Sequence, residues 1–217
     1  MATYIMSDIH GNFGRYKEFL QYSRFSGDDI LYIVGDVLDR GSEAIPMIQD
    51  IMQRNNVIMI KGNHEQMLLP ILDDLTYQSH EAQNQIISDE IEIAQIGQED
   101  TLRDFCKLSS REQNKITYFI SRLPVYKELA VNGINYILVH GGLPDFSDMP
   151  LEYYDENDLL FGPHDFFINH YGDGTKIIVG HIPTKFIEGA VPDEIYHIND
   201  TIAMDCGCGF GGQLGVL

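Results

Sequence analysis

The apolar residues in the first third of the chain follow two different spacings. Thr3–Met6, Ile30–Val34 and Val57–Ile60 are short apolar runs bounded by Asp, Gly or Asn, and each predicts a buried strand. Between these runs, Phe13–Tyr22 and Ser42–Arg54 carry apolar residues three and four positions apart, which predicts two helices. Strands that alternate with helices indicate a parallel sheet whose strands are joined by crossover helices.

The pattern changes between about residues 66 and 122. This stretch is rich in Gln, Glu, Asp and Ser, contains one glycine, Gly97, and predicts several helices. We expect them to form an insertion within a single domain of residues 1–217, because strand patterns return afterwards. The later strands are closely spaced, which indicates a second, more antiparallel sheet. They are predicted at Ile134–Val139, Lys176–Val179, Ile195–Ile198, Thr201–Met204 and Gly212–Leu217.

The composition excludes several classes of protein. Of the 217 residues, 14 are Lys or Arg and 33 are Asp or Glu, which gives a formal net charge of −19. A protein this acidic repels phosphate backbones, so we expect no nucleic-acid partner. The apolar runs fall well short of the ~20 residues of a membrane span, and the N-terminus lacks a basic leader segment. We therefore expect no membrane association and a cytoplasmic location, while the oligomeric state stays open.

Polar side chains follow five of the predicted strands at the point where each strand ends. The carboxyl ends of parallel strands meet at one edge of a sheet, so we expect these side chains to lie together. Their nitrogen and oxygen donors suit borderline divalent metals rather than calcium. The five segments are Ser7–Gly11, Gly35–Gly41, Lys61–Glu65, His140–Gly142 and Gly180–His181.

Two metal ions close together would share one bridging carboxylate. We expect Asp36 to be that bridge. Asp8 and His10 would complete one metal site, and Asn63, His140 and His181 would complete the other. Any one of these fragments could instead be a strand end with a hydrogen-bonded histidine. Five of them in order, each after a strand, favour a metal centre.

The same five segments resemble the signature of the calcineurin-like metallophosphoesterases. The match is closest to their phosphoprotein-phosphatase branch, which includes small bacterial Ser/Thr phosphatases and symmetrical diadenosine tetraphosphate hydrolases. The most specific element is Gly35-Asp36-Val37-Leu38-Asp39-Arg40-Gly41. Nuclease-like relatives usually carry Gly-His-x-His near the end, whereas this chain has Gly180-His181-Ile182-Pro183, which favours the phosphatases. The resemblance implies an α/β fold in which two mixed sheets pack as a sandwich flanked by helices.

The resemblance also implies a mechanism. A hydroxide that bridges two divalent ions would attack phosphorus, with manganese as our first choice of metal and iron or zinc as alternatives. His64 would be the general acid for the leaving oxygen, held in orientation by Asp39. Arg40 would clamp phosphate oxygens, and Asn63 and Lys61 would also face the substrate.

The chain departs from the family pattern in its cationic residues. Many relatives have Arg where this chain has Lys61, and a second phosphate-binding Arg usually lies between the His140 and His181 segments. No Arg follows Arg122 in this sequence. Phosphate binding would then depend on Arg40 and the metals, with His164 as a further candidate. His164 is otherwise expected to be a surface loop residue.

Three functions follow as hypotheses. The first is a two-metal phosphatase acting on phosphomonoesters, with phosphoserine, phosphothreonine or phosphotyrosine proteins as partners. The second is a symmetrical bis(5'-nucleosyl)-tetraphosphatase with the same chemistry. The third is a degenerate, non-enzymatic binding module, which the intact ligand set speaks against. The net charge of −19 favours the first over the second, because an acidic body disfavours a polyanionic substrate.

Overall fold

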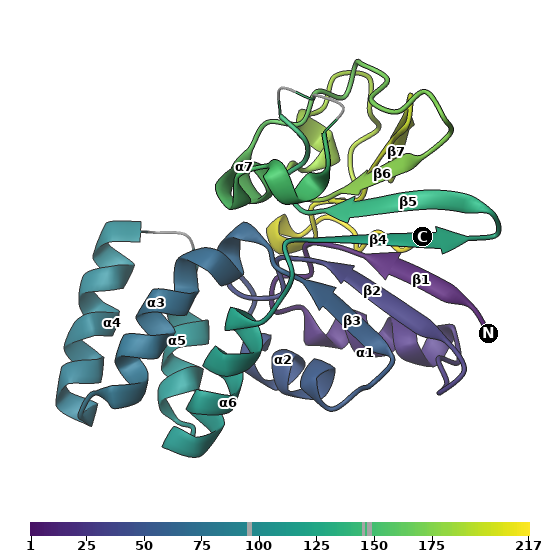
Figure 1. Cartoon of the computed structure of the whole chain (residues 1–217). Helices are drawn as coiled ribbons and strands as arrows, with labels where there is room; N and C mark the ends of the chain where they lie inside the picture. The colour runs from purple at the N-terminus through teal and green to yellow at the C-terminus, as the bar shows by residue number, and fades with distance from the viewer. Residues whose placement is uncertain (95–96, 145, 147–148) are drawn as a thin grey trace.

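Two β-sheets pack face to face, and helices cover their outer sides (Figure 1). The computed structural model describes residues 1–94, 97–144, 146 and 149–217. Residues 95–96, inside the predicted helical insertion, and 145 and 147–148 lie outside this description. The α/β sandwich that the sequence predicts is confirmed. No helix in the described ranges is long and apolar enough to cross a membrane.

The first sheet is three-stranded and parallel, in the order β1-β2-β3. It consists of β1 (Thr3–Met6), β2 (Ile30–Val34) and β3 (Val57–Ile60), joined by α1 (Phe13–Tyr22) and α2 (Ala44–Met52). All three strands and α1 have the predicted bounds, whereas α2 is shorter at both ends than predicted.

Alternate side chains of β2 enter different cores, as the period of a strand requires. Leu31 and Ile33 pack into the core between the first sheet and its helices. Tyr32 and Val34 point the other way, into the core between the two sheets, where they meet Leu138 of the second sheet. Burial on both faces explains why these strands are continuous apolar runs.

The second sheet is mixed, in the order β4-β5-β6-β8-β7. Pairing is parallel from β5 to β6 and from β6 to β8, and antiparallel at both edges. Its strands are β4 (Tyr126–Val131), β5 (Ile134–Val139), β6 (Lys176–Val179), β7 (Tyr196–Ile198) and β8 (Thr201–Ala203).

The sequence prediction for this sheet misses one strand and adds another. Edge strand β4 is not predicted because Lys127 and Glu128 are exposed and interrupt the apolar pattern. The predicted strand Gly212–Leu217 is wrong: in this segment the structure has only isolated bridges, from Met6 to Val216 and from Gly207 to Gln213. Its apolar residues pack against the core without forming a regular strand.

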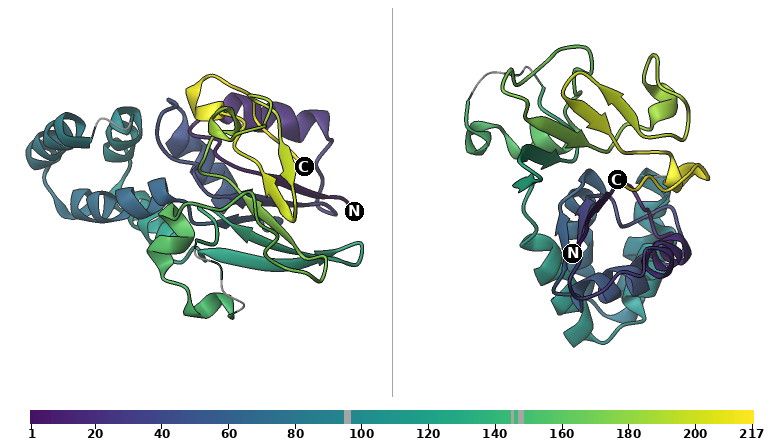
Figure 2. Two further views of the ribbon diagram at one scale, coloured as in Figure 1. Left: turned by 90° about the horizontal axis from the view of Figure 1, so that it is seen from above. Right: turned by 90° about the vertical axis from the view of Figure 1, so that its right-hand side faces the viewer.

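Four helices occupy the predicted insertion and extend to one side of the sheets (Figures 1 and 2). The first of them begins at Asn63, directly after β3, rather than at residue 66. The four are α3 (Asn63–Tyr77), α4 (His80–Ala94), α5 (Glu99–Cys106) and α6 (Ser110–Ser121). That they form an insertion within one domain of residues 1–217 stays a prediction. A short helix, α7 (Glu156–Phe161), covers the outer side of the second sheet (Figure 1).

Candidate active site

Asp36 lies at the centre of a buried cluster formed by the carboxyl ends of β1, β2, β5 and β6 and the start of α3. Its Oδ2 is 3.6 Å from Nε2 of His10, and its Oδ1 is 3.3 Å from Nε2 of His140. Asp36, His10 and His140 are each at most 2 % exposed. The predicted convergence of strand ends therefore takes place, and Asp36 lies between the two histidines. Its role as a bridging ligand stays a prediction.

Two groups of donor atoms share Asp36. Each group brings its nitrogen and carboxylate oxygen atoms within 4.8 Å of one another, a separation that a single metal ion can span. The groups are His10, Asp36 and His64, and Asp36, His140 and His181. The Oδ1 of Asn63 joins the second group, 2.8 Å from Nε2 of His140 and 2.9 Å from Nδ1 of His181.

Asp8 belongs to neither of the two donor groups. Its carboxylate accepts the backbone N–H of His181 at 3.1 and 3.2 Å and the hydroxyl of Ser7 at 2.5 Å. It is 1 % exposed. A carboxylate side chain on this strand end is well placed as a ligand, but the role of Asp8 stays a prediction.

The histidine rings are oriented as metal ligands are in proteins. His10 donates its Nδ1 hydrogen to the carbonyl of Leu38, and His140 donates its own to the carbonyl of Val34, both at 2.8 Å. A carbonyl only accepts, so in the neutral rings the Nε2 lone pairs face Asp36. Neutral nitrogens and a carboxylate pointing at one another fit a cation between them.

The charges of the centre agree with this donor set. Burial opposes ionisation of Asp36, but His140, His64 and His10 outweigh it and hold its pKa below the usual range. Burial also opposes protonation of His140, yet the Asp36 carboxylate raises the pKa of that ring to about 10. Burial lowers the pKa of His10 to about 3. Asp36 is thus ionised, and an ion bound at Nε2 of His140 would replace the proton that the Asp36 carboxylate otherwise holds on that ring.

Strained backbone is concentrated at this site. Ten non-glycine residues in the described part of the chain have positive φ, and six of them belong to the predicted site. Such conformations cost about 1–3 kcal/mol each and persist where function requires a particular side-chain direction. The six, with φ between 47° and 67°, are Asp8, His10, Asp36, Asp39, Arg40 and His181.

His64 and Asp39 form a buried pair next to the donor groups. The Nδ1 of His64 lies 2.7 Å from Oδ2 of Asp39. Burial opposes protonation of His64, but the hydrogen bond to Asp39 and the charge of Asp36 prevail and raise its pKa. With Nδ1 bound to Asp39, the Nε2 atom faces the centre, 3.9 Å from Oδ2 of Asp36. This geometry suits a general acid.

The guanidinium of Arg40 lies against two histidines of the cluster. Its Nη1 lies 2.7 Å from Nε2 of His10, and its Nη2 lies 3.1 Å from Nε2 of His64. The predicted insertion helps to position Arg40, because the backbone N–H of Arg40 donates to the carbonyl of Gly97 at 2.7 Å. Thr101 accepts the backbone N–H of Asp39 in the same way, at 3.2 Å. The helices between β3 and β4 therefore support the loop that carries Asp39 and Arg40.

Glu65 has a structural role that the sequence prediction did not assign. Fully buried, its carboxylate accepts the backbone N–H groups of Asp36, Val37, Leu38 and Gly62 at 2.9–3.1 Å. It thereby fixes the loop after β2 against the start of α3. Its place three residues after Gly62, a capping-box position, is the signal that could have predicted part of this.

Lys61, which the sequence predicts to face the substrate, is held by side chains of two helices. The ammonium of Lys61 is 2.9 Å from Oε1 of Glu156 on α7 and 3.1 Å from Oε1 of Gln66. A substrate role for Lys61 stays a prediction.

His164 is buried, so its expected place on a surface loop is wrong. Its Nε2 lies 2.8 Å from the hydroxyl of Thr201, and its Nδ1 accepts the backbone N–H of Leu143.

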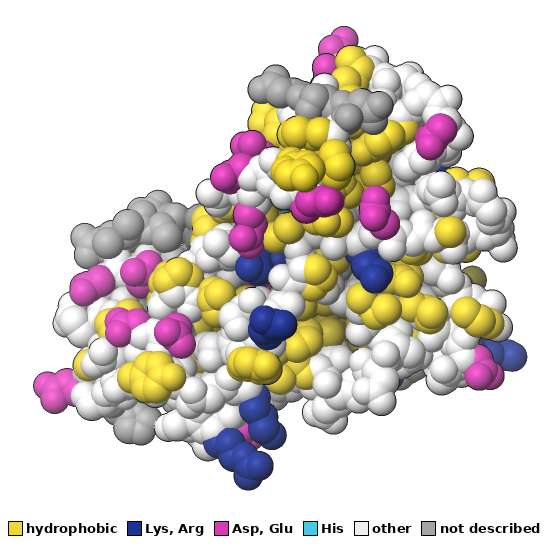
Figure 3. Space-filling model, viewed as in Figure 1, with side chains coloured by type: hydrophobic (Ala, Val, Ile, Leu, Met, Phe, Trp, Pro, Cys, Tyr) yellow, Lys and Arg dark blue, Asp and Glu magenta, His cyan; other side chains and the backbone are white. Residues whose placement is uncertain are grey.

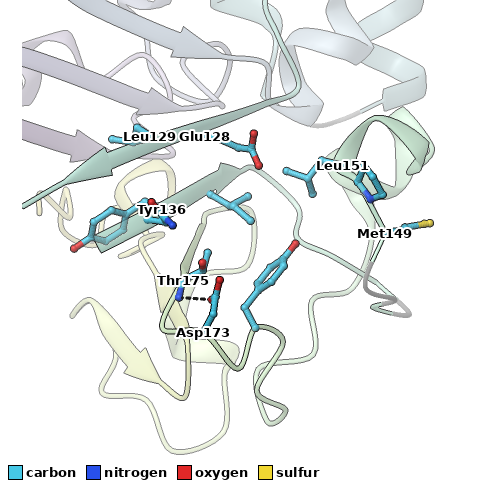
Figure 4. A pocket seen from close by; sticks show the side chains of 11 residues that line it. Glu128, Leu129, Tyr136, Met149, Leu151, Asp173 and Thr175 are labelled. Carbon is cyan, nitrogen blue, oxygen red and sulfur yellow. Dashed lines mark hydrogen bonds between the residues drawn. The ribbon is translucent and has the colours of Figure 1, made fainter. Parts of the chain in front are cut away.

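A separate pocket of about 690 Å³ lies on the outer face of the second sheet (Figure 4). It is lined from β4 by Glu128 and Leu129, from β5 by Tyr136, and from the later loops by Met149 and Asp173, among others. None of its lining residues is one of the predicted metal ligands. The strand-end cluster, rather than this pocket, is the candidate active site.

The chain belongs to the calcineurin-like phosphoesterase family, whose model matches residues 1–208. Members of this family hydrolyse phosphoester bonds with a dinuclear metal centre. The two donor groups around Asp36 agree with the dinuclear centre of this family.

Curated relatives include two tetraphosphatases. The symmetrical bis(5'-nucleosyl)-tetraphosphatase of Nitrosospira multiformis is 28% identical over 145 residues, 66% of this chain and 44% of that protein. The chain thus spans less than half the length of that relative. The asymmetrical bis(5'-nucleosyl)-tetraphosphatase PrpE of Oceanobacillus iheyensis is 26% identical over 244 residues, 99% of this chain and 87% of that protein.

A solved structure shares the fold. The crystal structure of a protein proposed to be a diadenosine tetraphosphatase superposes with a TM-score of 0.66 at 16% identity, covering 99% of this chain and 87% of that one. At this identity the likeness concerns the fold.

Proposed function

We propose that the chain hydrolyses dinucleoside tetraphosphates at the centre around Asp36. The observation that carries the proposal is the pair of donor groups that share Asp36, with the His64–Asp39 pair beside them. The two curated relatives supply the substrate class, since both are named for bis(5'-nucleosyl)-tetraphosphates. They favour this hypothesis over the phosphoprotein phosphatase that we placed first from the sequence.

The residues that would hold the metals are those at the strand ends. Asp8, His10 and Asp36 would hold one divalent ion, manganese by preference, and Asp36, Asn63, His140 and His181 would hold the other. Bound there, the ions supply Lewis-acid polarisation of phosphoryl oxygens and a lowered pKa for water. The orientation of the His10 and His140 rings supports this assignment.

The proton for the leaving group would come from His64. Its Nδ1–H donates to Asp39, which keeps the ring from rotating and favours its protonated form. The Nε2–H then faces the cluster and can be given to the oxygen that leaves phosphorus. Asp39 is itself buried, with no hydrogen bond to its Oδ1 in the described ranges, so its charge acts mainly on His64.

Arg40 would bind the phosphate. Its guanidinium is already directed at the two rings that flank Asp36, and its planar fork matches two phosphate oxygens. A phosphate in the cluster would accept from the Arg40 N–H groups that now face Nε2 of His10 and Nε2 of His64.

Product analysis tests the proposal. The protein, reconstituted with Mn²⁺, is incubated with diadenosine tetraphosphate, and the nucleotides are separated by ion-exchange chromatography. ADP alone indicates symmetrical cleavage, whereas ATP together with AMP indicates asymmetrical cleavage, and either result supports the proposal. Intact dinucleotide beside dephosphorylated phosphoserine peptide would overturn it. His64→Asn should lower the rate at least about 100-fold, and His197→Asn, which alters an exposed histidine of β7, is the matched control.

A further inference from the structure

An exposed cluster of aromatic and cationic side chains lies at the rim of the active site. Phe186 and Phe210 are 70% and 54% exposed, although each is a large apolar residue. The ammonium of Lys185 lies 5.0 Å from the ring centre of Phe186 and 4.8 Å from that of Phe210. The guanidinium carbon of Arg40 lies 4.2 Å from the ring centre of Phe210. Cation and ring therefore alternate outward from the donor groups.

The chain fixes these rings close to the metal ligands. Phe186 ends the short 3₁₀ helix η2 (Thr184–Phe186), and Phe210 ends η3 (Cys208–Phe210). The backbone N–H of Thr184 donates to the carbonyl of Asp205 at 2.8 Å, which ties the segments of η2 and η3 together. Gly209 packs against the ring of His10, where a Cβ atom would lie only 2.4 Å from Cδ2. Phe210 thus follows Gly209, which packs against the predicted ligand His10.

Lys185 is a cation available to a ligand. Its side chain is exposed, and no carboxylate lies within ion-pair distance of its ammonium in the part of the chain that the structure describes. Lys61, by contrast, is paired with Glu156. Lys185 also lies in the part of the chain after Arg122, which contains no Arg. It can therefore supply positive charge for a second phosphate, as a point charge rather than a fork.

We propose that Lys185, Phe186 and Phe210 form the subsite for a nucleoside polyphosphate portion of the substrate. This inference rests on the proposed function and names residues that would confer its specificity. The two rings offer aromatic faces on which a base can stack, and Lys185 holds a phosphate between the base and the catalytic centre. A ligand that is aromatic at one end and anionic along its length complements this surface.

A ratio of rates tests the subsite separately from the chemistry. The kcat/KM values for diadenosine tetraphosphate and for β-glycerophosphate, which has no base, are measured for each variant. Phe186→Ala and Phe210→Ala should each lower the ratio about 10- to 100-fold, the usual effect of losing one stacking partner. Lys185→Ala should lower it about tenfold. Tyr22→Ala and Lys127→Ala, which remove an exposed ring and an exposed cation elsewhere, should leave the ratio as in the wild type.

Phe210 also lies against the guanidinium of Arg40, and the ratio of rates distinguishes this contact from stacking on a base. If Phe210 only positions Arg40, its loss lowers kcat/KM for both substrates alike and the ratio stays constant, which overturns its role in the subsite. In the described residues the guanidinium of Arg40 lies over the ring of Phe210 and not over that of Phe186, so Phe186→Ala tests stacking without this cation–ring contact. A fall in turnover of a phosphotyrosyl peptide, with the dinucleotide unaffected, would show that the rings bind a peptide and would also overturn the proposal.

Binding of ADP gives a readout that does not depend on turnover. Calorimetric titration with ADP should show a Kd at least tenfold higher for Phe186→Ala than for the wild type. Equal Kd values would overturn the subsite even in an active enzyme. If the wild type hydrolyses β-glycerophosphate but not the dinucleotide, the proposed function fails, and the ADP titration still decides whether the subsite exists.

Discussion

Arg40 donates a hydrogen bond of 2.7 Å to Nε2 of His10, the atom through which we propose that His10 binds metal. A ring nitrogen has one lone pair, so it cannot accept this hydrogen bond and ligate an ion at the same time. The guanidinium also carries a charge of the same sign as the ion. Arg40 and the first metal therefore compete for one atom.

Removing Arg40 should separate metal binding from catalysis. We expect Arg40→Ala to bind Mn²⁺ several-fold more tightly, since a competing cation is lost, and to lose about 100-fold or more in kcat/KM, since the phosphate clamp is lost. Calorimetry on chelator-treated protein measures the first effect. Arg103→Ala, on the exposed surface of α5, is the control for charge alone. Weaker Mn²⁺ binding by Arg40→Ala would contradict the competition.

The His64–Asp39 pair should set the basic limb of the pH profile. Activity requires protonated His64, whose pKa is raised because Asp39 and Asp36 outweigh the effect of burial. The rate should therefore fall as pH rises through that pKa. His64→Asn should cost about 100- to 10,000-fold in kcat. Asp39→Asn removes a stabilising charge, so its fall in rate should begin at lower pH. An unchanged basic limb in Asp39→Asn would rule out this role for the pair.

Glu65→Gln should loosen the loop that carries Asp36. Each oxygen of Glu65 accepts two backbone N–H groups, and an amide nitrogen in place of one oxygen leaves buried donors unpaired. We expect the free energy of unfolding to fall by about 1–3 kcal/mol and the affinity for Mn²⁺ to fall with it. Urea denaturation measures the first and calorimetry the second. Glu188→Gln, at an exposed position, should change neither. Wild-type stability in Glu65→Gln would refute the role of its carboxylate.

His164 should make the protein sensitive to mild acid. Burial first, and then the neighbouring His170, lower the pKa of His164 to about 3, against an ordinary value of 6.5. Between these values the unfolded chain binds a proton that the folded chain does not. The stability conferred by the neutral ring is thus complete above pH 6.5 and is lost as pH falls toward 3, by up to about 1.4 kcal/mol per pH unit.

Urea denaturation at pH 7, 6 and 5 measures this slope. His164→Gln keeps a polar side chain that does not titrate, so its unfolding free energy should depend less steeply on pH than that of the wild type. His197→Gln, at an exposed site, should keep the wild-type slope. An equal slope in His164→Gln and the wild type would show that another group dominates.

The inner strands could be predicted because each is buried on both faces. Ile30–Val34 is apolar throughout, and its bounds follow from the residues that flank it. Tyr126–Val131 could not be predicted in this way, because an edge strand with exposed Lys127 and Glu128 lacks that pattern. The apolar residues of Gly212–Leu217 pack on the core as isolated bridges, which a local pattern does not distinguish from a strand.

The predicted ligands of the site follow strands and could be found from the sequence, whereas the residues at its rim could not. Ligands such as Asp36 and His140 follow strands, and the geometry of a sheet brings strand ends together. Lys185 and Phe210 lie on loops far apart in the chain, so their proximity depends on tertiary packing that no local spacing encodes. The net charge favoured a phosphoprotein, whereas the curated relatives favour a dinucleoside tetraphosphate; net charge is a sum over the whole surface and does not describe the site. On the face in Figure 3, acidic side chains lie over α3 and α4. At the site, by contrast, the two cations Arg40 and Lys185 lie against the ring of Phe210.

The central claim is that a dinucleoside tetraphosphate is the substrate of the centre around Asp36. The most direct measurement is kcat/KM for diadenosine tetraphosphate and for a phosphoserine peptide, with one preparation at one Mn²⁺ concentration. We predict a value at least tenfold higher for the dinucleotide, and a loss of about 100-fold or more for both substrates in His64→Asn. A higher value for the phosphopeptide, or hydrolysis of the dinucleotide by His64→Asn at the wild-type rate, would contradict the account.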